Sequence, residues 1–182
     1  YPGRSIAVPV TMPNAFDTIA RWHDAGLIRI RKNLRSLMSV AEHAGILLVI
    51  DGHGNFIFPD FQPAVDGMMA SVRLLEFLAV RGLRMSEVVE YLPPTHLAKE
   101  HVNCPWGAKG KVMRLLNEAH RGGHVDKIDG MKIHLDNEEW VHVLPSPDRP
   151  FVAVTAEADS TERAAELISE YRREIEQFIE AE

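Results

Sequence analysis

The stretch DGHGN at residues 51–55 groups polar side chains that could bind a sugar. It follows five consecutive apolar residues, Ile46–Ile50, which are typical of a strand buried on both faces. Sheets of the α/β class place ligand sites at the carboxyl ends of such strands. Asp51 could accept hydrogen bonds from hydroxyl groups, and His53 and Asn55 could donate them. The alternative, which the local sequence favours, is an ordinary polar turn between two strands.

A second candidate site is the turn PSPDRP at residues 145–150, between two apolar stretches. Successive backbone N–H groups in a turn can bind an anion, Ser146 adds a hydroxyl donor, and the Arg149 guanidinium suits phosphate. However, the three prolines lack an N–H, and Asp148 brings a negative charge to the same place. These residues therefore favour a rigid connector over a phosphate site.

A third candidate is the pair Lys109 and Lys111, close to Arg114 at the start of a predicted helix. The two lysines could attract phosphate, and Lys109 is kept as a candidate ligand. The preferred interpretation is ordinary solvated helix charge. Cys104 has no acid–base partner nearby in the sequence, so we interpret it as a structural thiol and not as a nucleophile.

The histidines form no tight metal-ligand motif such as H-E-x-x-H. They are residues 23, 43, 53, 96, 101, 120, 124, 134 and 142. His120 and His124 are four residues apart, but the Gly-Gly pair at 122–123 is expected to end the helix that would align them. The sequence therefore predicts no metal site and no catalytic residue of its own.

Alternating strands and helices are predicted before residue 92 and would position the first loop. The expected strands are 5–10, 27–30, 46–50 and 56–58, and the expected helices are 15–24, 34–43, 64–80 and 86–91. Asn14, Asn33 and Ser86 are the expected N-caps of three of these helices. This alternation predicts an α/β domain with a mixed, mostly parallel sheet over residues 1–92.

A different order follows the Pro-Pro pair at 93–94, which breaks regular structure. An extended segment at 95–102 precedes a helix from about 106 to 121, three antiparallel strands at 131–135, 140–144 and 151–157, and a long helix from Ser160 or Thr161. That last helix carries an apolar stripe of Ala164, Ile168, Tyr171, Ile175 and Phe178. Residues 93–182 are thus expected to form a small α+β domain with an antiparallel sheet and flanking helices.

The composition of the chain limits the classes of partner that it is expected to bind. The 182 residues have a net charge of -6 and no basic face, which argues against nucleic acid. No apolar run is long enough to span a membrane and no signal peptide is visible, so a cytoplasmic location is expected. One cysteine permits no internal disulfide. The opening YPGR runs straight into a strand, as expected for a piece of a longer polypeptide.

The order of these motifs resembles the C-terminal half, domains 3 and 4, of the α-D-phosphohexomutases, the phosphomannomutase/phosphoglucomutase family. Its third domain has a G-E-x-S-G-H sugar loop, an aromatic strand, D-G and a long helix, and IDGHGNFIFPDFQPAVDGMMASVRLLEFLA follows that order. Its fourth domain has D-G-x-K and then the phosphate loop W-x-x-V-R-x-S-x-T-E-P-x-x-R. The stretch DGMKIHLDNEEWVHVLPSPDRPFVAVTAEA follows that frame.

The chemistry of both loops departs from the family pattern. In the sugar loop, Asp51 replaces Glu, His53 replaces Ser and Asn55 replaces His. In the phosphate loop, only Ser146 and Pro150 are retained. The replaced positions are Leu144 and Ala153 for the two Arg, Asp148 for Thr and Arg149 for Glu. Losing two charge-assisted contacts, each worth about 1.5–3 kcal/mol, would remove most of the affinity for a sugar phosphate.

A closer resemblance is to the mutase-like tail of long bacterial sugar nucleotidyltransferases of the mannose-1-phosphate guanylyltransferase type. It rests on CPWGAKGKVMRLL, FIFPDFQP and WVHVLPSPDRPFVAVTAEA. In those chains a nucleotidyltransferase head and a left-handed β-helix precede the tail. The resemblance implies a role in regulation, assembly or weak sugar-phosphate binding.

Two other functions remain open. The chain could be the sugar-binding half of an active mutase, with Asp51 and His53 on the sugar and Ser146, Arg149 and Lys109 on phosphate, or a non-catalytic oligomerisation module. The resemblance places the phosphoserine and the Mg²⁺ loop of the family in an N-terminal half, so we expect no cofactor here and no mutase reaction by this chain alone. The expected partners are a hexose phosphate, the N-terminal part of a longer chain and a second copy, with no nucleic acid and no membrane.

Overall fold

The structure is a computed structural model that describes residues 3–181. The chain divides into two compact units, Tyr1–Pro94 and Thr95–Glu182, each with its own sheet. The division falls after the Pro-Pro pair, two residues beyond the predicted position, as suits a dipeptide that lacks both backbone donors. Among the described residues, no helix is long and apolar enough to cross a membrane.

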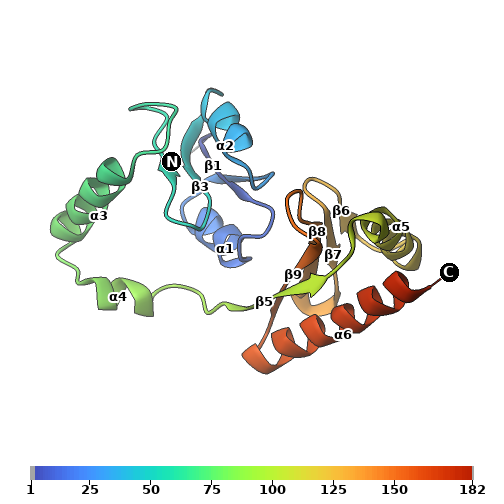
Figure 1. The fold of residues 1–182 in the computed structure, drawn as a ribbon. Helices are drawn as coiled ribbons and strands as arrows, with labels where there is room; N and C mark the ends of the chain where they lie inside the picture. Colours follow the sequence, from blue (N-terminus) through green and yellow to red (C-terminus); the bar gives the residue numbers. More distant parts are fainter. Residues whose placement is uncertain (1–2, 182) are drawn as a thin grey trace. The chain divides into compact units, whose positions relative to one another are not determined.

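The first unit is built on a four-stranded sheet of order β2-β1-β3-β4. The strands are β1 (Ser5–Pro9), β2 (Gly26–Ile30), β3 (Ile46–Ile50) and β4 (Phe56–Ile57). The helices α1 (Ala15–Trp22) and α2 (Leu34–Ala41) form the crossovers, so β1 pairs in parallel with both β2 and β3 (Figure 1). Because β4 returns antiparallel to β3, the sheet is mixed and mostly parallel, which confirms the prediction.

The helix starts of this unit follow the sequence rules only in part. Asn33 caps α2 as predicted, since its side-chain oxygen accepts the Ser36 N–H at 2.8 Å. The capping role predicted for Asn14 is wrong, because this residue is itself helical in backbone and makes no side-chain cap bond. Ser86 lies inside α4 (Met85–Glu90) and is not its cap. There the carboxylate of Glu87 accepts the N–H of Arg84 at 2.6 Å and marks the helix start.

The helix α3 (Gly67–Arg81) has no buried residue. Asp66 caps its start and Gly82, in the left-handed conformation at φ 63°, ends it. Its apolar stripe is exposed: Met68 is 82% and Leu75 is 65% exposed. Periodicity therefore located this helix without locating a core face.

The second unit has a five-stranded antiparallel sheet of order β5-β9-β8-β7-β6. The strands are β5 (His96–Asn103), β6 (Val125–Asp126), β7 (Met131–His134), β8 (Trp140–Pro145) and β9 (Phe151–Ala158). The prediction of three strands was incomplete. The extended segment became the edge strand β5, and β6, two residues long, was too short to produce a pattern.

Two helices pack on this sheet and close the core of the second unit (Figure 1). They are α5 (Lys109–Ala119), which follows a short 3-10 turn at Trp106–Ala108, and α6 (Thr161–Glu180). Ser160 caps α6 by accepting the Arg163 N–H at 3.2 Å. The predicted stripe of α6 is confirmed, because Ala164, Ile168, Tyr171 and Ile175 are buried and Phe178 packs against the same core.

Candidate functional site

The DGHGN loop is a turn between β3 and β4 that the Asp51 carboxylate holds together. One oxygen accepts the backbone N–H groups of His53 at 2.7 Å and Asn55 at 3.0 Å. The other oxygen accepts the side-chain amide of Asn55 at 2.5 Å. Gly52 and Gly54 both take positive φ, which lets the chain fold around the carboxylate. Asp51 thus organises the loop, with lone pairs left for a ligand hydroxyl.

The protonation of Asp51 follows from the same contacts. Burial raises the pKa of Asp51, but the hydrogen bonds from the Asn55 side chain and from the His53 and Asn55 amides outweigh it. The net pKa lies below the ordinary value, so the carboxylate is ionised at neutral pH. It can accept hydrogen bonds there and cannot serve as a general acid.

The three predicted sugar-loop residues line one pocket of about 330 Å³ inside the first unit. The other lining residues come from the start of α2 and the turn before α3: Lys32, Asn33, Leu34, Leu37 and Val65. This volume is at the lower end for small-molecule sites and suits a ligand of monosaccharide size. The structure therefore brings Asp51, His53 and Asn55 together in the lining of one pocket.

The turn at 145–150 uses its own backbone donors. The Ser146 hydroxyl accepts the N–H groups of Asp148 at 3.3 Å and Arg149 at 3.1 Å. The Ser146 N–H reaches the Phe151 carbonyl, and the Phe151 N–H reaches the Arg149 carbonyl. Because the prolines have no N–H, every backbone donor from residue 145 to residue 151 is used inside the turn.

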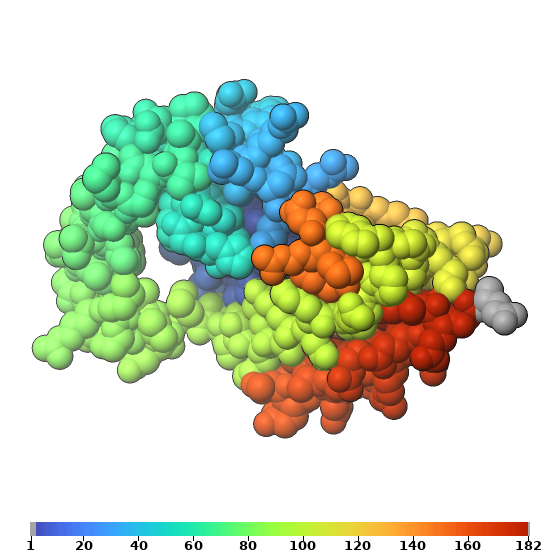
Figure 2. Space-filling model, in the orientation of Figure 1, coloured from blue at the N-terminus to red at the C-terminus, as the bar shows by residue number. Residues whose placement is uncertain are grey.

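Lys109 is bound to this turn from the start of α5. Its ammonium donates to the carbonyls of Ser146 at 2.6 Å and Arg149 at 2.5 Å, and it lies 3.7 Å from the centre of the Trp106 ring. Figure 2 shows the turn, in orange, lying against this part of the chain, in yellow-green. Lys109 is only 9% exposed. The interpretation of Lys109 as solvated helix charge was therefore wrong, because carbonyls and an aromatic face replace its water.

The other two cations of this helix start, Lys111 and Arg114, differ in whether they are solvated. Lys111 donates to the carbonyls of Ile179 and Ala181 at the end of α6, so it also is not simple solvated charge. Arg114 forms an exposed pair with Glu118 one helical turn away at 3.0 Å, as expected for solvated charge. Neither group points to a phosphate site.

Arg149 is the cation of the turn that remains available. It is exposed, and its guanidinium makes no hydrogen bond or ion pair within residues 3–181. Leu144 and Ala153, which stand where the resemblance places two arginines, are directly paired across β8 and β9. The turn therefore has one free cation, and an apolar pair lies beside it.

Cys104 lies beneath the same turn and is fully buried. Burial raises the pKa of the Cys104 thiol, against the smaller opposing effect of the Lys109 charge. Its N–H donates to the Pro150 carbonyl at 2.9 Å. A buried thiol with a raised pKa is a poor nucleophile, which agrees with a structural role.

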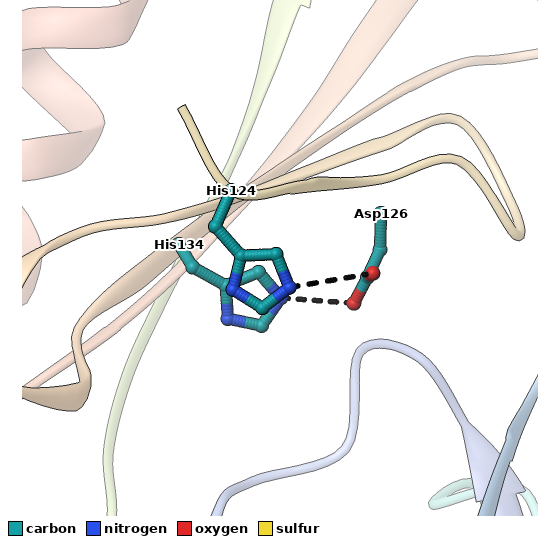
Figure 3. Close-up of side chains that lie close together, drawn as sticks. All are labelled: His124, Asp126 and His134. Atoms are coloured by element: carbon teal, nitrogen blue, oxygen red, sulfur yellow. Dashed lines mark hydrogen bonds and ion pairs between the residues drawn. The ribbon is translucent and has the colours of Figure 1, made fainter. Parts of the chain in front are cut away.

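One group of side chains was missed by the sequence analysis. His124, Asp126 and His134 converge at the edge of the second sheet, with ligand-type atoms within 4.8 Å of one another (Figure 3). In the sequence, His124 pairs by spacing with His120, four residues earlier, and the Gly-Gly pair between them argues against a shared helix. The available signal was the H-x-D spacing at 124–126, which puts both side chains on one face of a strand.

The chain has relatives among hexose-phosphate mutases, although no protein-family model matches it. It is 29% identical over 181 residues to a probable phosphoglucosamine mutase of Methanopyrus kandleri, covering 98% of the chain and 40% of that protein. It is 29% identical over 170 residues to a phosphoglucomutase/phosphomannomutase of Thermococcus kodakarensis, covering 91% of the chain and 36% of that protein.

Solved structures show the same fold. A phosphoglucomutase/phosphomannomutase family protein from Burkholderia thailandensis matches with a TM-score of 0.80 at 21% identity, over 97% of the chain and 38% of that structure. A putative phosphomannomutase from Thermus thermophilus matches with a TM-score of 0.68 at 23% identity, over 96% of the chain and 37% of that structure.

The homologues and structural neighbours of this chain are phosphoglucosamine mutases, phosphoglucomutases and phosphomannomutases. This finding confirms the predicted relationship to the mutase family. The chain spans about 40% or less of the length of these relatives. The link to nucleotidyltransferases stays a prediction.

Replacing Asp51 with Asn is expected to lower the free energy of unfolding by about 1–3 kcal/mol near neutral pH. The oxygen that accepts the Asn55 side-chain NH2 group would become an NH2 group itself, so two donors would face each other. A depressed carboxyl pKa stabilises the fold above the unfolded value, and this stabilisation is lost as pH falls through the folded pKa. In urea unfolding followed by circular dichroism, the difference between the two proteins should therefore stay constant from pH 7 down to the mildly acid range and shrink as pH falls below the ordinary carboxyl value of 3.8. Glu90→Gln, at an exposed carboxyl of the same unit, should show a much smaller difference at pH 7; an equal effect would refute the assignment.

Replacing Lys109 with Met is expected to cost about 1–3 kcal/mol, because two carbonyls lose their charged donor. Hydrogen exchange at the Asp148 and Arg149 amides should accelerate, since the turn loses its link to α5. Lys99→Met, at an exposed lysine of the same unit, is the matched control and should change neither quantity. Unchanged exchange in the Lys109 variant would show that the turn does not depend on this lysine.

Proposed function

We propose that this chain is the mutase-like region of a sugar-1-phosphate nucleotidyltransferase of the mannose-1-phosphate guanylyltransferase type. In this proposal the region contributes regulation, assembly or weak sugar-phosphate binding, and its former phosphate loop has become structural. The observation that carries the proposal is the closed state of the turn at 145–150: Lys109 and the backbone donors of the turn are all bound within the protein.

The hydrogen bonds inside the turn at 145–150 make phosphate binding there less favourable. A phosphate entering it would have to replace the bonds from Asp148 and Arg149 to the Ser146 hydroxyl, and would meet the Asp148 carboxylate. Lys109 could reach that phosphate only by abandoning two carbonyls, which would then lie unsatisfied. The gain from a new charge-assisted bond is thereby offset by the bonds lost.

The Leu144–Ala153 pair also supports the proposal. Residues directly opposite in an antiparallel pair have Cβ atoms about 4.5–5.5 Å apart. Two arginines at these positions could therefore share one phosphate through their planar forks of donors. Leu144 and Ala153 occupy these positions with atoms that cannot form hydrogen bonds.

The sugar loop supports a weak residual affinity. Its pocket keeps an ionised carboxylate, an imidazole and a carboxamide side by side, which are suited to sugar hydroxyls. A ligand bound there would be recognised through its hydroxyl groups more than through its phosphate. The proposal leaves the group-transfer chemistry to the rest of a longer chain.

Isothermal titration calorimetry with mannose 1-phosphate, mannose 6-phosphate and the glucose phosphates tests the proposal. We expect dissociation constants no tighter than about 1 mM, because the turn offers one free cation. Micromolar binding that is lost in Ser146→Ala and Arg149→Gln would contradict the proposal. It would show instead a working phosphate site.

The double variant Leu144→Arg, Ala153→Arg tests whether the turn at 145–150 occupies the place of a phosphate-binding loop. Each restored charge-assisted contact is worth about 1.5–3 kcal/mol, so affinity for the same sugar phosphates should rise roughly tenfold or more. The variant Leu144→Gln, Ala153→Gln has similar bulk without charge and should show no such rise. Equal affinity in both variants would mean that these positions do not face a phosphate.

A second candidate is the sugar-binding half of an active phosphomannomutase or phosphoglucomutase. The pocket at Asp51, the free Arg149 guanidinium and the names of the relatives favour it. A coupled assay for interconversion of mannose 6-phosphate and mannose 1-phosphate by the full-length protein separates the two. Turnover would favour this candidate, and no turnover by a folded protein would remove it.

A further inference from the structure

A short hairpin at the edge of the second sheet brings two histidines and an aspartate together. In the β6–β7 pair, Val125 lies opposite Ile133, and the His134 N–H donates to the His124 carbonyl at 2.9 Å. His124 and His134 are therefore cross-strand neighbours on one face. Asp126, two residues after His124, shares that face because side chains alternate along a strand.

The side chains of this hairpin are directed at one another (Figure 3). Nε2 of His134 lies 2.9 Å from Oδ2 of Asp126, and Nε2 of His124 lies 3.9 Å from Oδ1 of the same carboxylate. The two imidazole rings are stacked, with centroids 4.2 Å apart and planes 15° apart. Both histidines thus present the same ring nitrogen to one carboxylate.

These separations are close to those of a coordination sphere. Ligand atoms about 2.0–2.2 Å from a zinc ion in tetrahedral geometry lie roughly 3.3–3.6 Å from each other. The two nitrogen–oxygen distances lie on either side of this range, and all three ligand-type atoms lie within 4.8 Å of one another, so side-chain displacements on the order of 1 Å would admit an ion. His124, whose side chain is 74% exposed, is free to make the larger adjustment.

The surroundings favour a cation. His124 and His134 border an open pocket whose charged lining is four carboxylates and one arginine: Asp136, Glu139, Asp159, Glu170 and Arg163. Lys132 lies directly opposite Asp126 on the same face and adds one positive charge. Its ammonium lies over the Trp140 ring, 4.0 Å from the ring centre. The local charge is thus negative on balance.

A purely structural role accounts for only part of this cluster. The hydrogen bond between His134 and Asp126 would stabilise the hairpin without any ion. That bond does not involve His124, which is mostly exposed, lies beyond hydrogen-bond distance of the carboxylate and stacks on the His134 ring. His124 is therefore the residue that separates a metal site from a local hydrogen bond.

We propose that His124, Asp126 and His134 bind a divalent transition-metal ion of the zinc type through the two Nε2 atoms and a carboxylate oxygen. Two imidazoles and one carboxylate suit Zn²⁺ and its first-row neighbours, whereas Mg²⁺ and Ca²⁺ prefer oxygen ligands alone. Three protein ligands leave a fourth position for water or for an oxygen atom of a ligand in the adjoining pocket. This proposal does not depend on the function proposed for the 145–150 turn.

Calorimetric titration of the 182-residue chain with Zn²⁺ alone tests the site. One ion is expected to bind per chain at this site, with Mg²⁺ giving no competing heat. His124→Ala should weaken that binding roughly tenfold or more while leaving the circular dichroism spectrum unchanged, because an exposed side chain is lost. Asp126→Asn should weaken it as well, although its amide oxygen can still accept a hydrogen bond from His134.

The control is His101→Ala, which removes an exposed histidine of the same unit and should leave the binding unchanged. A second readout is paramagnetic broadening by Co²⁺ in NMR spectra, which should be strongest at the amides of 124–126 and 134. Equal affinity of the wild-type chain and His124→Ala would overturn the proposal. So would binding weaker than about 0.1 mM in the wild-type chain, or broadening centred on another histidine.

Discussion

The buried ammonium of Lys109 determines what the turn at 145–150 can bind. A lysine that is withdrawn from water needs acceptors for its donors, and here the carbonyls of Ser146 and Arg149 supply them beneath the Trp106 ring. This contact joins the start of α5 to the turn between β8 and β9. The Cys104 N–H adds a second link by binding the Pro150 carbonyl. The turn is thus held from inside the unit: the carbonyls of Ser146, Arg149 and Pro150 and the backbone N–H groups of the turn all bind within the protein.

Both candidate loops bind their own backbone N–H groups with a side-chain oxygen, but they differ in what they leave for a ligand. In each, a side-chain oxygen gathers backbone N–H groups: the Asp51 carboxylate in the first unit and the Ser146 hydroxyl in the second. A carboxylate has acceptor capacity to spare and lies beside a pocket. The hydroxyl takes up the backbone N–H groups of the turn, so an anion would find only the Arg149 guanidinium and the Ser146 O–H as donors there. Hydroxyl recognition is therefore easier to retain in this chain than phosphate recognition.

The sequence predicted features that depend on local patterns. Apolar runs and their spacing gave the alternating order of the first unit, the Asn33 cap and the buried stripe of α6. The burial of Lys109 was not predictable in this way, because its partners lie 37 and 40 residues away along the chain. The capping of α4 was misjudged because Ser86 stands two residues after the cap position, Arg84, whose N–H is bound by the Glu87 carboxylate. Motif order revealed the mutase relationship, whereas the state of the turn required coordinates.

The β6–β7 hairpin shows how a short strand can carry chemistry that no pattern predicts. β6 has two residues, so few ladder hydrogen bonds hold it to β7, and among the strands of residues 3–181 β6 pairs with β7 alone. An ion bound by His124 and His134 would join the two strands at the open end of the hairpin. Because the ligands converge only when the strands are paired, binding free energy would add to the stability of that pairing. The metal affinity of the cluster and the local stability of this edge are therefore coupled quantities.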